Sequence, residues 1–210
     1  MPIAPREWPP VSDASRELLD KGEQAENDLR LREALTYYTR ALELEPNNPS
    51  CIAAVAGILG RLGDWDRFVE LERRLLQFFP EDVLQWMGLG NALLSFLHRP
   101  LEAVEAFRKA VELDGATLAP RLGLIQSLSA AQKHEEAISH AEEALRDERI
   151  EQRAKERAFL YEVYGDALFR AVRKSDAAEA YGKALDLRVA GDPRRVELQR
   201  KERVAKQTPQ

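Results

Sequence analysis

The chain has 210 residues, of which 44% are hydrophobic and 32% charged, and its formal net charge at pH 7 is −5. Such a balance is typical of a folded, helix-rich protein and argues against a general electrostatic attraction to nucleic acid. Cys51 is the single cysteine, which excludes an internal disulfide and a cysteine-based metal cluster. The sequence has no secretory signal pattern and no apolar stretch long enough to cross a bilayer, and therefore predicts a cytoplasmic protein.

The first twelve residues contain four prolines around Trp8. Because proline lacks a backbone donor and favours extended chain, residues 1–12 are expected to form a Pro-rich tail. Pro2 and Pro5 form a P-x-x-P pattern, which occurs often by chance. The favoured interpretation is a tail with Trp8 folded back onto the first helix.

From residue 15 to residue 187 a helix-pair pattern returns about every 34 residues. The first helices of these pairs carry a recurring slot, small in most pairs, occupied by Gly22, Ala56, Gly90, Ile125 and Gly165. The second helices carry a close-packing position occupied by Ala34, Phe68, Ala103, Ala137 and Ala177. Periods of this length predict stacked helix hairpins, an all-α solenoid with a continuous core.

In chain order, the repeat predicts units near 15–48, 49–82, 83–117, 118–151 and 158–191 within a repeat domain at 13–187. The first hairpin should pair helices near 15–27 and 31–44, after which Pro46 ends the helix and Asn48 caps the next. The second unit is irregular, because Phe68 at a close-packing position should push its two helices apart. About six extra residues between the last two units should lengthen the following helix, with a start near Ile150.

Residues 192–210 are expected to form a charged helix and tail that cap the last exposed core surface. Gly191 and Asp192 supply the break and the cap before this helix. Its arginines and lysines are interleaved with Glu197 and Glu202 and lack aromatic neighbours, so a solvated face is preferred to a nucleic-acid surface.

Two units carry a spaced set of aromatic, small and apolar residues that resembles the tetratricopeptide repeat. These residues are Trp86, Leu89, Gly90, Leu93, Ala103, Phe107 and Ala110, then Tyr161, Tyr164, Gly165, Leu168, Ala177, Tyr181 and Ala184. The resemblance implies a right-handed α-solenoid of about five antiparallel helix pairs. It also implies that the first helix of each pair lines a concave groove.

The resemblance places two rows of residues in this groove. One row lies one residue past the small slot and comprises Glu23, Gly57, Asn91, Gln126 and Asp166; the other lies four residues earlier and comprises Leu19, Ala53, Met87, Leu122 and Glu162. Carboxamides both donate and accept hydrogen bonds, so Asn91 and Gln126 suit the backbone of an extended peptide, or are simply solvated. Met87 and Leu122 would add adaptable apolar contacts. The candidate protein-binding residues are Asn91, Gln126, Met87, Leu122, Asp166 and Glu162.

Members of the resembled family are known for gripping a C-terminal carboxylate with paired Lys and Asn side chains. The corresponding positions here hold Leu19, Glu23, Ala53 and Ala54. A glutamate would repel a carboxylate, so binding of the carboxylate-clamp type is not expected.

Catalytic patterns are absent from the sequence. It has no phosphate-binding glycine loop, and His134 and His140 do not have the i, i+4 spacing of a zinc helix. Cys51 is interpreted as a small core thiol. No enzymatic activity, cofactor or metal is therefore expected.

The leading hypothesis is a non-catalytic scaffold that binds a protein or peptide partner in its concave groove. The alternative is an oligomerising or structural subunit, suggested by Leu76, Phe78 and Phe79 at a hairpin end. Nucleic-acid binding is a weaker third hypothesis, because the charge balance is acidic and no basic groove is evident. Neither nucleic acid nor membrane is expected as a partner.

Overall fold

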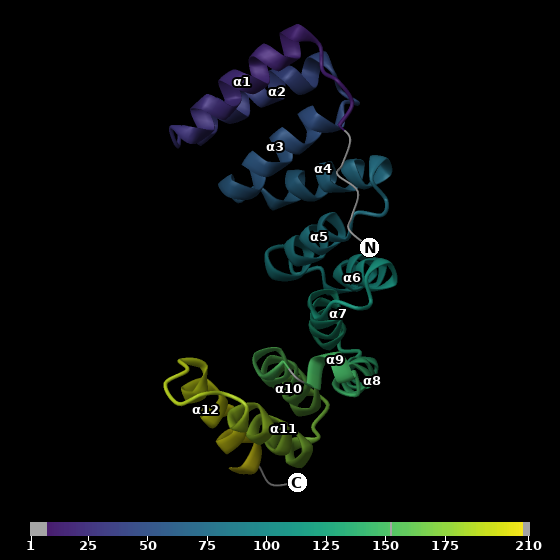
Figure 1. Cartoon of the computed structure of the whole chain (residues 1–210), viewed down its shortest axis with the longest axis vertical. Coiled ribbons are helices and arrows are strands. Elements are labelled where there is room, and N and C mark those ends of the chain that lie inside the picture. The colour runs from purple at the N-terminus through teal and green to yellow at the C-terminus, as the bar shows by residue number, and fades with distance from the viewer. Residues whose placement is uncertain (1–7, 152, 208–210) are drawn as a thin grey trace. The chain divides into compact units, whose positions relative to one another are not determined.

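The computed structural model describes residues 8–151 and 153–207, which form helices and connecting turns without any strand in those ranges. The helices alternate with short turns in the order that the repeat predicts, which confirms the all-α fold (Figure 1). Their bounds are α1 (Asp13–Asn27), α2 (Leu31–Leu44), α3 (Pro49–Leu62), α4 (Trp65–Phe78), α5 (Val83–Ser95), α6 (Pro100–Leu113), α7 (Leu118–Ala130), α8 (His134–Leu145), α9 (Glu148–Glu151), α10 (Ala154–Arg170), α11 (Lys174–Asp186) and α12 (Arg194–Gln207).

The helices fall into two compact units, unit 1 at Met1–Ala92 and unit 2 at Leu93–Gln210, with the boundary inside α5. Among the described residues, no helix is both long and apolar enough to cross a bilayer.

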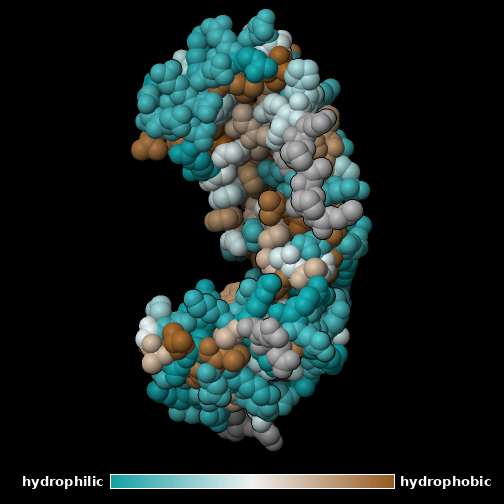
Figure 2. Space-filling view, in the orientation of Figure 1, coloured by the Kyte–Doolittle hydropathy of each residue, from teal (hydrophilic) through white to brown (hydrophobic). Residues whose placement is uncertain are grey.

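Unit 1 is built from α1 packed on α2, α3 packed on both, and α4 packed on α3 (Figure 1). Its core includes Ile52, Leu59 and Leu75, each at most 1% exposed. Gly22 allows α1 to approach α2 closely, because a Cβ at Gly22 would lie 2.2 Å from the ring of Tyr38. The outer surface over α1 and α2 is mostly hydrophilic (Figure 2). Close helix contacts at the predicted glycine therefore set the first hairpin.

The described part of the N-terminal segment runs along the helix ends of unit 1. The Trp8 ring meets the Phe79 ring edge-on at a centroid distance of 5.4 Å, so the expectation that it folds onto the first helix is wrong. Asn48 Nδ2 donates to the Pro10 carbonyl at 3.1 Å, and Ser12 donates from both its N–H and its hydroxyl to Glu45. Hydrogen bonds from the Ser12 hydroxyl, from Ser15 and from the Ser12 N–H lower the pKa of Glu45 to about 2. Pro2 and Pro5 lie outside the described residues.

The irregular second hairpin accommodates its large side chain through a glycine. A Cβ at Gly60 of α3 would lie 3.4 Å from the ring of Phe68, so the ring occupies the space that Gly60 leaves open. Leu76 is buried at 6% exposure, contrary to its expected place on an exposed hairpin end, whereas Phe78 is 44% exposed. The patch that suggests self-association is therefore smaller than the sequence indicates.

Unit 2 continues with α6 on α7, α7 on α8, and α10 against both α7 and α8, followed by α11 and α12. A Cβ at Gly165 would lie 2.6 Å from the ring of Tyr181, which reproduces the contact between Gly22 and Tyr38. In α7, Ile125 is fully buried at the predicted slot, but the glycine beneath an aromatic ring is Gly123, facing Phe107 of α6. This contact joins α7 to the second helix of the preceding hairpin, whereas the contacts at Gly22 and Gly165 lie within one hairpin.

The extra residues before the last hairpin do not form one long helix. They form the short helix α9, and α10 begins only at Ala154, with Arg153 as a non-helical N-cap at φ −103° and ψ 75°. Asp147 accepts a hydrogen bond from the Arg149 N–H at 3.1 Å, which starts α9 as a separate turn. The expected start near Ile150 is therefore wrong, although α10 at 17 residues is longer than the other first helices.

Candidate functional site

The candidate site consists of the two predicted rows on the first helices, called here the inner-face positions. In unit 1 they lie on α1, α3 and α5, and in unit 2 on α7 and α10. Burial of the neighbouring slot fixes their orientation, because a residue one position further along a helix is rotated by about 100° away from the core. Ala56, Gly90, Ile125 and Gly165 are all buried, as this arrangement requires.

The inner-face positions of unit 1 are open. Gly57 on α3 has no atom within 4 Å of a Cβ added to it, and Glu23 on α1 is exposed. On α5, Asn91 is exposed and Met87 partly buried, while Leu84, one turn earlier, is 73% exposed. In Figure 2 the surface over α3 and α5 is paler and browner than that over α1. Unit 1 therefore presents small and apolar groups beside one exposed carboxamide.

In unit 2 the positions on α7 repeat this pattern. Gln126 is exposed and Leu122, four residues earlier, is partly buried. One turn beyond Gln126, Ser129 accepts a hydrogen bond from Arg170 of α10 at 3.0 Å, which links α7 to α10. An exposed carboxamide next to a half-buried apolar side chain thus occurs in both units.

The positions on α10 are occupied by the chain itself. Lys201 of α12 donates to Glu162 at 3.2 Å and to Asp166 at 3.0 Å. Arg188 binds the second oxygen of Glu162 at 3.1 Å, and Tyr181 donates to Asp166 at 2.8 Å. Burial and the Asp166 carboxylate raise the pKa of Tyr181 above its usual range, so its hydroxyl stays a donor. α10, the first helix of the last pair, therefore offers a partner far less free surface than α7.

Sequence reasoning misses the role of Lys201 in this closure. The pattern favours a solvated face for the basic side chains of α12, but Lys201 faces α10, and Arg195 donates to the carbonyls of Leu185 and Arg188 at 2.6 Å each. Leu198 is fully buried, and Lys201 follows it by three residues on the same helix face. That spacing is the signal from which the contact between Lys201 and α10 could have been predicted.

The positions compared with a carboxylate clamp are acidic or apolar in the structure. Glu23 is exposed, and Glu26, one turn further, forms an ion pair with Arg61 at 2.5 Å. Leu19, Ala53 and Ala54 are partly buried. This part of unit 1 presents carboxylates to solvent while its nearby arginine is already paired.

The groups considered for chemistry belong to different units, Cys51 to unit 1 and His134 and His140 to unit 2. Cys51 is fully buried, and this burial raises its pKa to about 11, which matches a core thiol rather than an activated nucleophile. His134 begins α8 and His140 lies further along the same helix, partly buried beside Glu143. Within the described ranges, no three His, Cys, Asp or Glu side chains are grouped so as to hold a metal ion.

Comparison with known proteins supports the fold. No family model matches the sequence. A curated relative, the small glutamine-rich tetratricopeptide repeat-containing protein 2 of Mycosarcoma maydis, is 32% identical over 94 residues, which is 45% of this chain. The chain spans about a quarter of that relative's length, 26%.

Solved structures agree over most of the chain. A MamA fragment from Desulfovibrio magneticus RS-1 has a TM-score of 0.67 at 20% identity and covers 85% of this chain and 97% of its own. YrrB, described as a TPR protein with an unusual peptide-binding site, has a TM-score of 0.71 at 19% identity, covering 89% and 90%. TTC0263, a TPR protein of Thermus thermophilus, has a TM-score of 0.54 at 19% identity, covering 91% and 98%.

The successive helix pairs with close glycine–aromatic contacts define an all-α solenoid fold. Taken with these similarities, they identify the chain as a protein of the tetratricopeptide-repeat fold.

Proposed function

We propose that the chain is a non-catalytic interaction scaffold that binds an extended segment of a protein partner on the inner-face positions of its first helices. The observation that carries this proposal is the repeated pair of an exposed carboxamide and a half-buried apolar side chain, Asn91 with Met87 and Gln126 with Leu122. The fold supports the general role, and YrrB supports a peptide as the kind of ligand.

The chemistry of these side chains suits an extended backbone. A carboxamide offers two N–H donors and a carbonyl acceptor, so Asn91 and Gln126 can each satisfy one peptide group of a bound segment. Met87 and Leu84 would contact its side chains in unit 1, and an unbranched methionine adapts to several shapes. Binding of this type favours apolar and neutral polar partner residues, because neither carboxamide carries a charge.

The proposed contacts leave out Glu162 and Asp166. Both carboxylates are held by Lys201 of α12, which leaves Glu162 12% and Asp166 36% exposed, so a ligand would have to compete with that lysine for them. The contact residues that we propose are therefore Asn91, Met87, Gln126 and Leu122. Binding at these residues does not use a carboxylate clamp.

An affinity capture from lysate of the source cells tests the proposal with the wild type beside Asn91→Glu/Gln126→Glu. Introducing two carboxylates at exposed positions adds charge without filling the core, so helicity measured by circular dichroism should not change. A matched control, Gln77→Glu/Gln199→Glu, makes the same charge change at exposed positions outside the two rows. Proteins bound by wild type and control but lost from the inner-face variant would support the proposal. Equal capture by all three would contradict it.

A further inference from the structure

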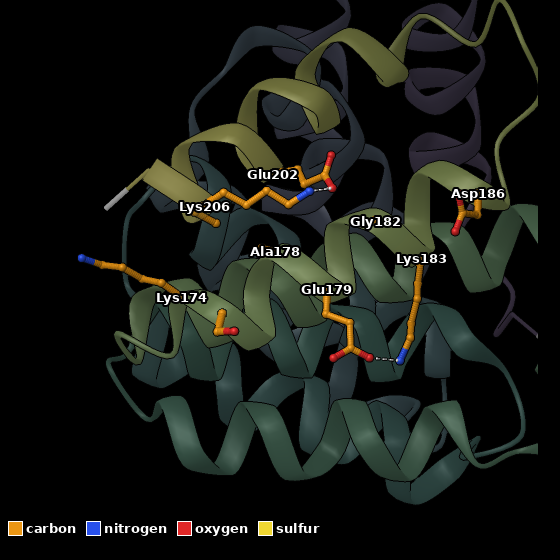
Figure 3. A pocket seen from close by; sticks show the side chains of 10 residues that line it. Lys174, Ala178, Glu179, Gly182, Lys183, Asp186, Glu202 and Lys206 are labelled. Carbon is orange, nitrogen blue, oxygen red and sulfur yellow. Dashed lines mark hydrogen bonds and ion pairs between the residues drawn. The ribbon is translucent and has the colours of Figure 1, made fainter. Parts of the chain in front are cut away.

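A second surface lies at the end of unit 2, between α11 and α12. These helices enclose an open groove of 610 Å³ whose lining includes the small residues Ala178, Gly182 and Ala205. Ala178 and Gly182 lie on the α11 side of the groove (Figure 3). Each rim carries an ion pair of its own, Lys183 with Glu179 on α11 and Lys206 with Glu202 on α12, both at 2.6 Å. Because Ala178, Gly182 and Ala205 are small, the backbone of another helix could approach closely.

Lys174 and Asp186, the first and last residues of α11, stand at opposite ends of this groove (Figure 3). Among the described residues neither side chain forms an ion pair. They lie twelve positions apart, which is about 18 Å along a helix. The groove therefore has an unneutralised cation at one end and an unneutralised anion at the other.

The charges along α11 are complementary to their own reverse. In chain order the stripe at four-residue spacing along the groove reads Lys174, Ala178, Gly182 and Asp186, which is plus, small, small, minus. A second α11 in antiparallel orientation reads minus, small, small, plus over the same length. Centred on position 180, such a pairing sets Lys174 opposite Asp186 and the small Ala178 opposite the small Gly182.

We propose that this groove binds a second copy of the chain, with α11 of each copy lying in the groove of the other around a two-fold axis near position 180. A two-fold interface requires a patch that complements itself, and this stripe does so in both charge and size. The surface is separate from the inner-face positions, so the proposal does not depend on the proposed function.

Two charge reversals test this pairing without weakening the monomer. Lys174→Glu places an acid at the N-terminus of α11, and Asp186→Lys places a base at its C-terminus, and the helix dipole favours both changes. In a dimer of either single variant, two pairs of like charge face each other across the axis. Each variant should then dimerise at least about tenfold more weakly than the wild type, because two repulsive pairs oppose association.

The decisive sample is an equimolar mixture of the two single variants. In the mixed dimer the new carboxylate at position 174 of one copy faces the new ammonium group at position 186 of the other. The native Asp186 of the first copy faces the native Lys174 of the second, so both pairs are again opposite in charge. Sedimentation equilibrium over a wide concentration range should show dimers for the wild type, for the mixture and for Lys174→Glu/Asp186→Lys.

A steric variant, Gly182→Gln, should be monomeric. A Cβ at Gly182 is tolerated within the chain, at 3.6 Å from a carboxylate oxygen of Glu202, but the longer side chain blocks close approach of a second helix.

A wild type that stays monomeric at its highest concentration would overturn the proposal. So would single variants that dimerise like the wild type, or a mixture that recovers no dimer. Circular dichroism of every variant distinguishes lost pairing from lost folding.

Discussion

One guanidinium nitrogen of Arg188 lies 3.1 Å from a carboxylate oxygen of Glu162, and both side chains are nearly buried, at 9% and 12% exposure. The other oxygen of Glu162 accepts from Lys201 of α12 at 3.2 Å. A single carboxylate on α10 thus joins the turn after α11 to the last helix. Because Leu198 of α12 is also fully buried, both charge and packing hold α12 over α10.

Replacing Arg188 should destabilise unit 2 strongly. Arg188→Met keeps most of the side-chain volume but removes the cation that Glu162 and Asp192 share. Lys201 still binds Glu162, so the expected cost is that of the lost charged hydrogen bonds, about 2 kcal/mol. Urea unfolding followed by circular dichroism measures this loss. The matched control is Arg200→Met, because Arg200 is 68% exposed and pairs with Glu197, and it should change the free energy of unfolding by less than about 1 kcal/mol. Equal effects of the two changes would contradict the account.

A valine in a turn is expected to be a poor choice for stability. Val172 precedes the N-cap of α11 with φ at +64°, a conformation that strains a β-branched residue, and its side chain is 72% exposed. Val172→Gly should raise the free energy of unfolding by about 1 kcal/mol, because relief of strain outweighs the small loss of buried surface. Gly63 holds the same position before α4, with φ at +78°. Gly63→Val should therefore lower the free energy of unfolding. Thermal unfolding of both variants checks the opposite signs.

The same substitution should have opposite effects at two glycines of the first helices. Gly165→Ala places a Cβ 2.6 Å from the buried Tyr181 ring, and overpacking of this kind costs about 1–3 kcal/mol. Gly57→Ala meets no atom within 4 Å and should stabilise α3 by about 0.5–1 kcal/mol through helix propensity alone. Urea midpoints of the two variants should therefore move in opposite directions. A loss at Gly57 would show that this inner-face position is not open.

The Cys51 thiol should be unreactive in the folded protein. Burial raises its pKa from 9.0 to about 11, so the folded state favours the neutral thiol. The stability that this contributes is complete below pH 9 and is lost as the pH rises through 11. At pH 8 an aromatic disulfide reagent should modify the native chain far more slowly than the urea-unfolded chain. Equal rates would mean that Cys51 is exposed.

Local signals in the sequence predict the helices well, because their causes are local. Asn48 caps α3 through its side chain, and Gly63 ends the same helix in the left-handed conformation, as both residue types indicate. The contact between Trp8 and Phe79 could not be predicted, because it joins residues 71 positions apart in the sequence. The break between α9 and α10 also has no glycine or proline to mark it.

The inner-face positions are only partly predictable for the same reason. Periodicity alone indicates that Gln126 faces away from the core, and it is exposed. Whether Asp166 is equally open depends on the direction from which α12 returns, and Lys201 covers part of it. Helix periodicity says which side a residue faces but not which distant helix covers that side.

The most direct measurement is a photo-crosslinking scan with a photoreactive residue placed singly at Asn91, Gln126, Asp166, Gln77 and Gln199 and exposed to lysate of the source cells. Binding on the inner faces predicts crosslinks to the same partner from positions 91 and 126, fewer from position 166, which Lys201 partly covers, and little or none from 77 and 199. Crosslinks from 77 or 199 in the absence of any from 91 and 126 would contradict binding on the inner faces.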